Sequence, residues 1–392
     1  MADLLTIRKV ENQRDFKLFF EFPWVLYKTD PHWVPPLLSQ RRELLDKAKN
    51  PEWQYLVGDY YLAMRGNRPV GTIAAFINKR HNETHQENLG WFGFFECEND
   101  QEAANGLLQA AVDFAAANGC IGVRGPASFT LNDECGLLIE GFEQPILLMP
   151  YNYPYYQQLI ENSPFGFSKV MDTVSYVTDP SGYLDENGNV PADIKRQITT
   201  ATERFKVSMR RAELADLKNE VMRLADIYRS AWAKNWGFVP PTDAEMEALF
   251  ANLRQFFDPQ LGEFGLVDGQ IAGFMLALPD MNQVLKHAYP RPGEPEIITL
   301  LKAFWHWKIR PKITRQRILL YGIKAEYRRM GVDAAIILAH IESTKDSRYP
   351  IVDMGWVLET NTPVDMIVKR FGGRVWRRYR FFQAPLPNAS PA

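Results

Sequence analysis

The chain of 392 residues is long enough for two domains, because a single hydrophobic core usually stops growing well below this length. Apolar residues make up 46% of it and charged residues 23%, proportions that are typical of globular proteins and argue against a disordered chain or a fibre. The net charge of -2 argues against nucleic acid as a partner, and three cysteines without a Cys-x-x-Cys pair argue against a zinc site or a disulfide framework, so we expect no metal.

The first half of the chain contains apolar periodicities that predict alternating strands and helices. Arg65-Gly66-Asn67-Arg68 separates two alternating runs and predicts a hairpin, and Gly119 ends a long Ala-rich helix. The predicted elements are a strand over 5–10, helices over 13–27 and 39–49, strands over 55–64, 70–77 and 89–96, a helix over 100–118 and a strand over 121–124. A further helix and strand bring the series to about Val177.

The second half repeats this order of elements without visible sequence identity, and its hairpin turns at Asp268-Gly269. Its predicted elements are a strand over 205–210, helices over 214–232 and 243–257, a hairpin over 265–277, a strand over 317–323, a helix over 332–344, a strand over 351–357, a helix over 362–371 and a strand over 374–382. Residues 179–191 are rich in Gly, Pro and Asn. We therefore predict domains over 1–178 and 204–386, a linker over 179–203 and a loose tail over 387–392.

The stretch from Leu319 to Ile337 predicts a buried strand, a tight turn and an amphipathic helix with no spare residues between them. A helix that begins in this way points several unpaired backbone amides, and the positive end of its dipole, at whatever lies in front of it. The stretch therefore predicts an anion-binding site. An ordinary helix-capping turn is the alternative.

This stretch resembles the acyl-CoA pyrophosphate loop of the GNAT superfamily of N-acyltransferases, which reads Gln/Arg-x-x-Gly-x-Gly/Ala. The segment from Arg328 to Val332 fills the first five places, whereas Asp333 puts a negative charge in the sixth, where it can instead cap helix amides. The resemblance implies that the second half binds acyl-CoA and needs no metal. The residues it assigns to the cofactor are Ile323, Arg328, Arg329, Met330, Gly331, Val332, Asp333, Ala334 and Asn361.

A second stretch, from Trp356 to Gly373, resembles the other GNAT signature, in which a strand ends at an Asn-Thr-Pro helix start. By that resemblance Asn361 hydrogen-bonds the pantetheine arm and the strand around 355–357 pairs with the amides of that arm. A plain helix N-cap is the alternative for Asn361, and both roles can coexist.

The superfamily often places a tyrosine in the middle of this last helix to protonate the departing thiolate, but the aligned residue is Val368. Tyr379 on the final strand is a candidate for the acid, with simple packing as the alternative. Glu326 and Glu359 are the carboxylates nearest to the two motifs and are candidate bases for the amine. Surface or capping roles are their alternatives, and water can replace them.

Four strings, at 30–36, 132–138, 149–156 and 235–240, resemble those of the bacterial ceramide synthase-like, or YghO-like, group of tandem GNAT proteins. This resemblance spans nearly the whole chain. It implies acyl-CoA-dependent N-acylation of a primary amine, with a long-chain amino alcohol or other lipid-like amine as a lead for the acceptor.

The first half lacks the pyrophosphate pattern, because Cys97-Glu98-Asn99-Asp100 stands in its place and would repel phosphate. We therefore expect a degenerate GNAT unit that shapes the acceptor site. The expected acceptor-binding residues are Tyr151, Asn152, Tyr155, Tyr156, Asn235 and Trp236, with a domain-interface patch as the alternative for the tyrosines.

Apolar residues at helical spacing between Ile297 and Lys308 predict an inserted amphipathic helix with flanking Lys and Arg residues. Such a helix can lie on an anionic membrane surface, cover an acyl chain or dock on the protein's own core. The N-terminus lacks a secretory signal pattern, and no apolar run approaches the ~20 residues of a membrane span. We therefore expect a cytoplasmic protein, with a peripheral membrane position left open.

The predicted fold is α/β (α+β), with two tandem GNAT-like units that each contain a mixed, mostly antiparallel sheet flanked by helices. The predicted function is direct attack of an amine on an acyl-CoA thioester. Two alternatives remain: a non-catalytic CoA- or ligand-binding protein of GNAT shape, and a tandem-GNAT enzyme that transfers an aminoacyl group. Acyl chain length and oligomeric state stay open.

Overall fold

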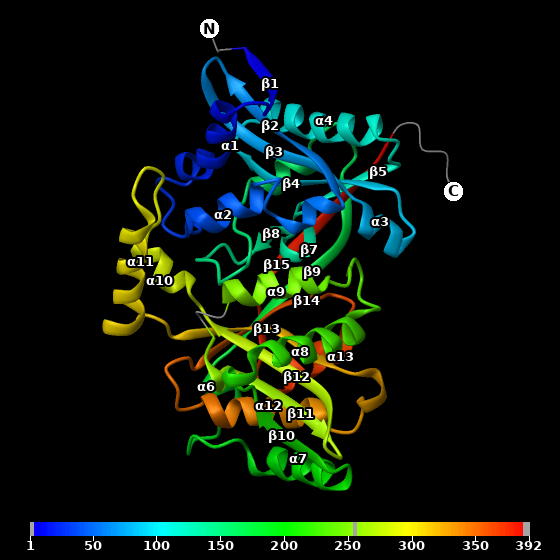
Figure 1. Ribbon diagram of the computed structural model, residues 1–392, viewed down its shortest axis with the longest axis vertical. Helices are drawn as coiled ribbons and strands as arrows, with labels where there is room; N and C mark the ends of the chain where they lie inside the picture. Colours follow the sequence, from blue (N-terminus) through cyan, green and yellow to red (C-terminus); the bar gives the residue numbers. More distant parts are fainter. Residues whose placement is uncertain (1–3, 254–256, 387–392) are drawn as a thin grey trace. The chain divides into compact units, whose positions relative to one another are not determined.

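The structure, a computed structural model, describes residues 4–253 and 257–386 (Figure 1). The predicted tail over 387–392 lies outside the described residues. The chain divides into two compact units. The first unit comprises Met1–Thr173, Leu285–Ile309 and Arg377–Ala392, and the second comprises Val174–Val284 and Arg310–Trp376. No helix in the described part of the chain is long and apolar enough to span a membrane.

The sheet of the first unit has the strand order β1-β2-β3-β4-β5-β15-β9, with β8 also paired to β15. The described pairs are antiparallel except for β4 and β5, which run parallel. The strands are β1 (Leu5–Lys9), β2 (Leu56–Arg65), β3 (Arg68–Asn78), β4 (Leu89–Cys97), β5 (Gly122–Gly125), β8 (Leu137–Glu140), β9 (Ser168–Thr178) and β15 (Arg374–Pro385), with the small pair β6 (Ala127–Ser128) and β7 (Thr130–Cys135) beside them.

Helices cover both faces of this sheet because side chains alternate along each strand. Helix α1 (Gln13–Leu26) packs Phe19 against Tyr60 of β2. Helix α4 (Gln101–Ala117) buries its alanines and leucines on the opposite face, with Ala63 and Ile73. The other helices are α2 (Leu38–Leu45), α3 (Lys79–His85), α5 (Tyr156–Glu161), α10 (Asn282–Ala288) and α11 (Glu296–Phe304), the last continued by a π-helical turn over Trp305–Ile309.

The second unit contains the strand order β14-β13-β12-β11-β10, and β9 enters it at Val174. Strands β10 (Val207–Arg211), β11 (Gly262–Val267), β12 (Gln270–Pro279) and β13 (Arg315–Ile323) are antiparallel, and β14 (Ile351–Leu358) runs parallel to β13. The predicted turn is confirmed at Asp268 and Gly269, whose φ angles of 48° and 80° suit a two-residue hairpin.

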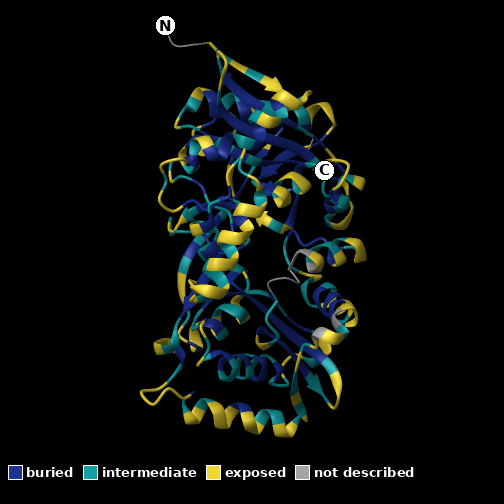
Figure 2. Ribbon diagram, turned by 60° about the vertical axis from the view of Figure 1, so that its left-hand side comes forward, coloured by how far each residue is buried: buried dark blue, intermediate teal, exposed yellow. Residues whose placement is uncertain are grey.

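Helices also flank this second sheet. One core joins α8 (Leu217–Trp232) and α9 (Asp243–Leu253) to residues such as Phe274 of β12. A separate core joins α12 (Val332–Thr344) to Ala272 and Met275 of the same strand. The remaining helices are α6 (Pro180–Tyr183), α7 (Ala192–Arg204) and α13 (Thr362–Arg370). In Figure 2 the buried residues follow the strands of each unit, and exposed residues lie mainly on helices and loops.

The fold class is confirmed, but three features differ from the expectations. Residues 179–203, expected as a linker, hold α6 and α7, and Ile198 of α7 is buried against Ala335 of α12. The inserted segment 285–309 clusters with the first unit although it interrupts the second in sequence. Helix α3 and strands β6 to β8 were not predicted, because their short sequences show neither helical spacing nor regular alternation of apolar residues.

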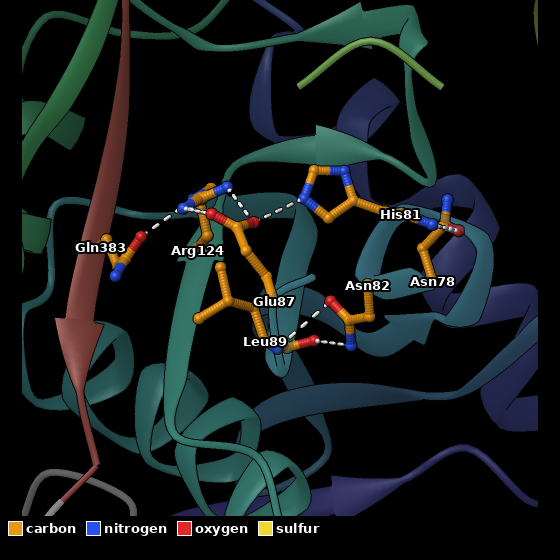
Figure 3. Close-up of polar contacts among 7 residues, drawn as sticks. All are labelled: Asn78, His81, Asn82, Glu87, Leu89, Arg124 and Gln383. Atoms are coloured by element: carbon orange, nitrogen blue, oxygen red, sulfur yellow. Dashed lines mark hydrogen bonds and ion pairs between the residues drawn. The ribbon is translucent and has the colours of Figure 1, made fainter. Parts of the chain in front are cut away.

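A charged network joins the start of β4 to β5 and β15 in the first unit (Figure 3). Arg124 donates two hydrogen bonds of 2.9 Å to the carboxylate of Glu87 and a third, also 2.9 Å, to Oε1 of Gln383. Nε2 of His81 lies 2.8 Å from Oε2 of Glu87. Burial alone would raise the pKa of Glu87, but the hydrogen bonds from His81 and Arg124 outweigh it and lower the pKa to about 2.

Because this folded-state pKa is depressed, the ionised Glu87 stabilises the fold above its ordinary value of 4.5, and the contribution is lost as pH falls towards 2. We predict that Glu87→Gln lowers the free energy of unfolding by about 1–2 kcal/mol at neutral pH. The deficit relative to wild type should shrink between about pH 5 and about pH 3, as urea unfolding would measure. Glu83→Gln, which replaces an exposed carboxylate on the neighbouring helix α3, is the control. A deficit that stays constant with pH would contradict this account.

Candidate anion site at the start of α12

The connection from β13 to α12 is short and contains two residues with left-handed backbone. β13 ends at Ile323, a single 3-10 turn follows over Ala325–Tyr327, and α12 begins at Val332. Arg329 has φ 66° and Gly331, the N-cap, has φ 79°. A Cβ on Gly331 would lie 2.9 Å from the Cβ of Ala201 on α7. Only glycine therefore fits at this position without strain.

The N-cap glycine leaves the first amides of α12 without a capping side chain. The backbone N–H groups of Val332, Asp333 and Ala334 belong to the first turn, where no carbonyl of the helix can accept them. The dipole of the 13-residue helix adds positive potential there. Arg328 and Arg329, both exposed, flank this end, and Arg328 donates a 3.2 Å hydrogen bond to the carbonyl of Ala231. This geometry suits an anion, and the anion site itself stays a prediction.

A buried hydroxyl group faces the same region. Tyr321 of β13 packs with Val332 and Met330, and its hydroxyl has no hydrogen-bond partner among the described residues. Burial, and to a smaller extent the charge of Asp333, raises the pKa of this tyrosine well above its ordinary value. An unsatisfied buried hydroxyl is costly. The orphaned hydroxyl and the glycine cradle therefore fit a ligand that brings hydrogen-bond acceptors, such as the pyrophosphate expected here.

Strands β13 and β14 separate near this site. Their described parallel register covers Arg315 to Ile318 against Ile351 to Met354, yet both strands continue further. Beyond that point the buried Arg317 holds the carbonyl of Gly355 with hydrogen bonds of 3.2 and 3.1 Å. From Trp356 onward, β14 therefore has no described register pair with β13. This is the segment expected to pair with the pantetheine arm.

Asn361 is the N-cap of α13, which is the alternative role that the sequence analysis gives for it. Its side-chain oxygen accepts a 3.5 Å hydrogen bond from the backbone amide of Val364. Its side-chain amide can still donate to a ligand. Val368 is buried with Val174 and Tyr176, so the position where GNAT proteins often carry a tyrosine here serves the core.

The three candidate catalytic residues are distributed over both units. Glu326 lies in the exposed 3-10 turn before α12, and Glu359 is exposed just after β14. Tyr379 belongs to the first unit, where it is fully buried on β15 opposite Leu138. Their catalytic roles stay predictions.

The first unit has closed the equivalent helix start with its own side chains. Asp100 caps α4 by accepting a 3.1 Å hydrogen bond from the amide of Ala103. Arg65 pairs with Asp100 at 2.7 Å and with Glu102 at 2.7 Å. The amides of this helix therefore have a built-in acceptor, and a phosphate would meet two carboxylates.

The residues expected to bind the acceptor also divide between the units. Asn235 and Trp236 lie in the turn after α8, in the second unit. The others lie in the first unit, where Asn152 is buried and braces both the amide and the carbonyl of Leu138 at 2.8 and 3.0 Å. Tyr151 donates to Asp30, and Tyr155 donates to the carbonyl of Cys97.

Tyr156 is fully buried and donates a 2.8 Å hydrogen bond to Glu96, a residue that the sequence analysis missed. The only sequence signal was a carboxylate at the end of an otherwise apolar strand. Among residues 4–253 and 257–386, no group of three or more His, Cys, Asp or Glu side chains is placed to hold a metal ion.

Solved structures show which fold the chain has. The tandem GNAT protein from the clavulanic acid biosynthesis pathway aligns with a TM-score of 0.54 at 12% identity, over 99% of this chain and 100% of that one. A GCN5-related N-acetyltransferase from Sphaerobacter thermophilus aligns with a TM-score of 0.51 at 12% identity, over 99% and 98%. The chain therefore has the tandem GNAT fold.

Two curated bacterial proteins are similar along nearly the whole sequence. Protein YghO of Escherichia coli (strain K12) is 28% identical over 382 residues, which cover 96% of this chain and 94% of YghO. Bacterial ceramide synthase of Caulobacter vibrioides is 29% identical over 391 residues, which cover 98% of each chain. No family model matches the chain. The resemblance to the tandem-GNAT, bacterial ceramide synthase-like group is confirmed.

The contact between Gly331 and Ala201 can be measured through stability. We predict that Gly331→Ala lowers the free energy of unfolding by more than the about 1–2 kcal/mol expected for a left-handed residue alone, because the new methyl group also meets α7. Gly269→Ala is the matched control, with φ 80° and nothing within 4 Å of the added carbon. Ala201→Gly in the Gly331→Ala background should recover the difference. Equal urea-unfolding costs for the two single variants would refute the contact.

Proposed function

We propose that the chain is an acyl-CoA-dependent N-acyltransferase whose second unit binds the CoA thioester and whose acceptor is a primary amine. The observation that carries the proposal is the start of α12, where an N-cap glycine leaves backbone amides open beside two arginines. That arrangement suits a pyrophosphate better than an uncharged ligand. Because acyl-CoA thioesters are cytoplasmic metabolites, we place the reaction in the cytoplasm.

Different residues of the second unit would bind the pyrophosphate and the pantetheine arm of CoA. The amides of Val332 to Ala334 and the side chains of Arg328 and Arg329 would hold the pyrophosphate, and Asn361 with the open edge of β14 would hold the pantetheine arm. The neutral amine attacks the thioester carbonyl, so that a C–N bond forms and the C–S bond breaks, CoA leaves as a thiolate, and the proton that the nitrogen loses ends on that thiolate as the free thiol of CoA. A backbone amide near residues 354–357 would polarise the carbonyl oxygen. No step requires a metal.

The acceptor is proposed to be a long-chain amino alcohol or another lipid-like amine. The support is the similarity along 98% of the chain to a protein named bacterial ceramide synthase. The relative's name states the class of product, and at 29% identity the substrate of this chain can differ.

The exposed surface of the inserted helix is a second observation that supports a lipid-like substrate. Of the fourteen large hydrophobic residues that are exposed in the described chain, seven lie between Ile297 and Ile309, so they form a patch. The patch consists of Ile297, Ile298, Leu300, Leu301, Phe304, Trp305 and Ile309.

The opposite side of this helix is attached to the first unit. Glu296 accepts hydrogen bonds of 2.8 and 2.5 Å from the amide and hydroxyl of Ser39, and Thr299 is buried. Glu294 pairs with Lys302 at 3.0 Å, so both nearby acids are engaged. Lys308 remains exposed over the ring of Trp307, at 3.8 Å. We propose that this apolar and basic face lies on an anionic lipid surface.

The CoA site can be tested by calorimetric titration with CoA and acyl-CoAs. We predict that Arg329→Gln raises the dissociation constant for CoA about three- to tenfold, because it removes a charge beside the pyrophosphate without touching a packed residue. Arg329 is a sharper probe than Gly331, where any side chain also strains the fold. Arg14→Gln, an exposed arginine in the first unit, is the matched control and should bind like wild type.

Absence of CoA binding by the wild type would overturn the proposal. Binding of CoA without consumption of any thioester in a screen of amines would favour a non-catalytic CoA-binding protein instead.

The lipid-facing helix predicts binding to vesicles that contain anionic phospholipid. Leu301→Gln should weaken co-sedimentation with such vesicles about tenfold, since Leu301 is 64% exposed and would insert into the interface. Met366→Gln is the control, because Met366 is equally exposed, at 66%, but lies on α13. Unchanged vesicle binding by Leu301→Gln would refute the proposal that this face of the helix binds lipid. Loss of a dimer in this variant, seen by light scattering, would assign the face to a second copy of the chain.

A further inference from the structure

Glu96, the second-to-last residue of β4, is the half-buried centre of a polar cluster in the first unit. Its Oε2 accepts hydrogen bonds from the hydroxyls of Tyr27 at 2.6 Å and Tyr156 at 2.8 Å. The two hydroxyls lie 3.3 Å apart, and that of Tyr156 also accepts from the amide of Cys97 at 2.9 Å. Both tyrosine side chains are fully buried. One carboxylate oxygen is therefore held rigidly in place.

The other oxygen of this carboxylate is available. Oε1 of Glu96 has no hydrogen-bond or ion-pair partner among the described residues. Arg41 of α2 interacts electrostatically with Glu96 but makes no ion pair with it, and its Nε donates to the carbonyl of Phe20 at 3.2 Å. A half-buried carboxylate and a half-buried guanidinium that attract each other without forming an ion pair can each take a polar partner from a ligand.

Aromatic rings pack next to both charges: Arg41 lies over the rings of Phe20 and Trp24, at 5.7 and 5.9 Å, and further rings pack on Tyr27, the partner of Glu96. Trp33 stacks on Tyr27 with 5.2 Å between ring centroids, and Tyr153 lies 5.0 Å from the same ring. Rings of this kind attract a cation through their faces and cover hydrocarbon equally well. The cluster thus offers a carboxylate oxygen, a guanidinium group and an aromatic wall.

We infer that Glu96 and Arg41 bind the polar head of the amine acceptor in the first unit. An ammonium group donates to Oε1 of Glu96, and a hydroxyl or carbonyl oxygen next to the amine accepts from Arg41. The ligand class is an amino alcohol or amino ketone with a hydrocarbon chain. This inference rests on the proposed function for the identity of the ligand as an acyl acceptor, but the binding site itself does not depend on CoA.

The titration of Glu96 adds a second readout. Burial raises the pKa of Glu96 to about 7, against the opposing effect of the hydrogen bonds from Tyr27 and Tyr156. The other charges that face it are Arg41 and Glu134. A raised carboxyl pKa means that the negative charge is lost as pH falls through 7, so binding of an ammonium group weakens in the same range. A carboxylate that titrates there can also take the proton that the amine must lose.

The test is calorimetric titration of the full chain with 2-amino-1-octanol, and with 1-octanol as the ligand that lacks the amine. We expect Glu96→Gln to weaken binding of the amino alcohol at least tenfold at about pH 8 and to leave binding of 1-octanol unchanged. Glutamine can still accept both tyrosine hydrogen bonds, so the variant should fold, which thermal melting checks. Glu98→Gln, which changes the next carboxylate along the chain, should bind like wild type.

The pH series separates a direct contact from a structural effect. Amino alcohol affinity should rise from about pH 6 to about pH 8 in the wild type and be flat in Glu96→Gln. Equal affinity of wild type and Glu96→Gln, or no binding by the wild type, would overturn the inference. CoA titrated into the same proteins distinguishes the two proposals. If the wild type binds the amino alcohol but not CoA, the proposed acyl-CoA-dependent function is wrong and the inference about Glu96 and Arg41 still holds.

Discussion

Unsatisfied backbone amides at the start of α12 are the constraint around which the second unit is arranged. A side chain that could accept these N–H groups is excluded there, because Gly331 is left-handed and its Cβ position is taken by Ala201 of α7. No capping side chain balances the positive potential at this end of the helix, so an anion can bind there. Helix α7 contributes Ala201 to this arrangement, so part of the segment expected as a linker packs against α12.

The two units show how the same strand-to-helix unit can keep or lose such a site. In both, two parallel strands pair only at their beginnings: β4 with β5 over three residue pairs, and β13 with β14 over four. In the first unit, Asp100 supplies the acceptor that α12 lacks, and Arg65 neutralises it. A single side chain at the N-cap thus decides between a self-contained helix and a binding site. Glu96, with the two tyrosines that donate to it, lies near the end of β4, the strand that leads into α4.

Local patterns in the sequence predicted most of the fold, whereas the candidate site stays a prediction and the sequence did not point to Glu96. The bounds of α12 and the turn at Asp268 follow from periodicity and turn chemistry, which depend on neighbours in the chain. Glu96 could not be found in this way, since its partners Tyr27 and Tyr156 are 69 and 60 residues away. The same limit applies to segment 285–309, whose attachment to the first unit depends on Ser39 and other distant residues.

Trp33 links the polar cluster around Glu96 to the inserted segment 285–309 in the first unit. One face of its indole stacks on Tyr27, which binds Glu96, while its carbonyl accepts a 3.0 Å hydrogen bond from Lys286 of the inserted segment. Trp24 packs edge-on against Trp33 and donates a 2.7 Å hydrogen bond to the carbonyl of Pro290. The segment that presents the apolar patch is therefore fixed to the same aromatic group that borders the polar cluster. A long-chain amine needs both environments at once, because its hydrocarbon chain and its charged head cannot be satisfied by one kind of surface. Adjacent aromatic residues of the first unit therefore join the apolar patch of the inserted segment to the polar cluster around Glu96.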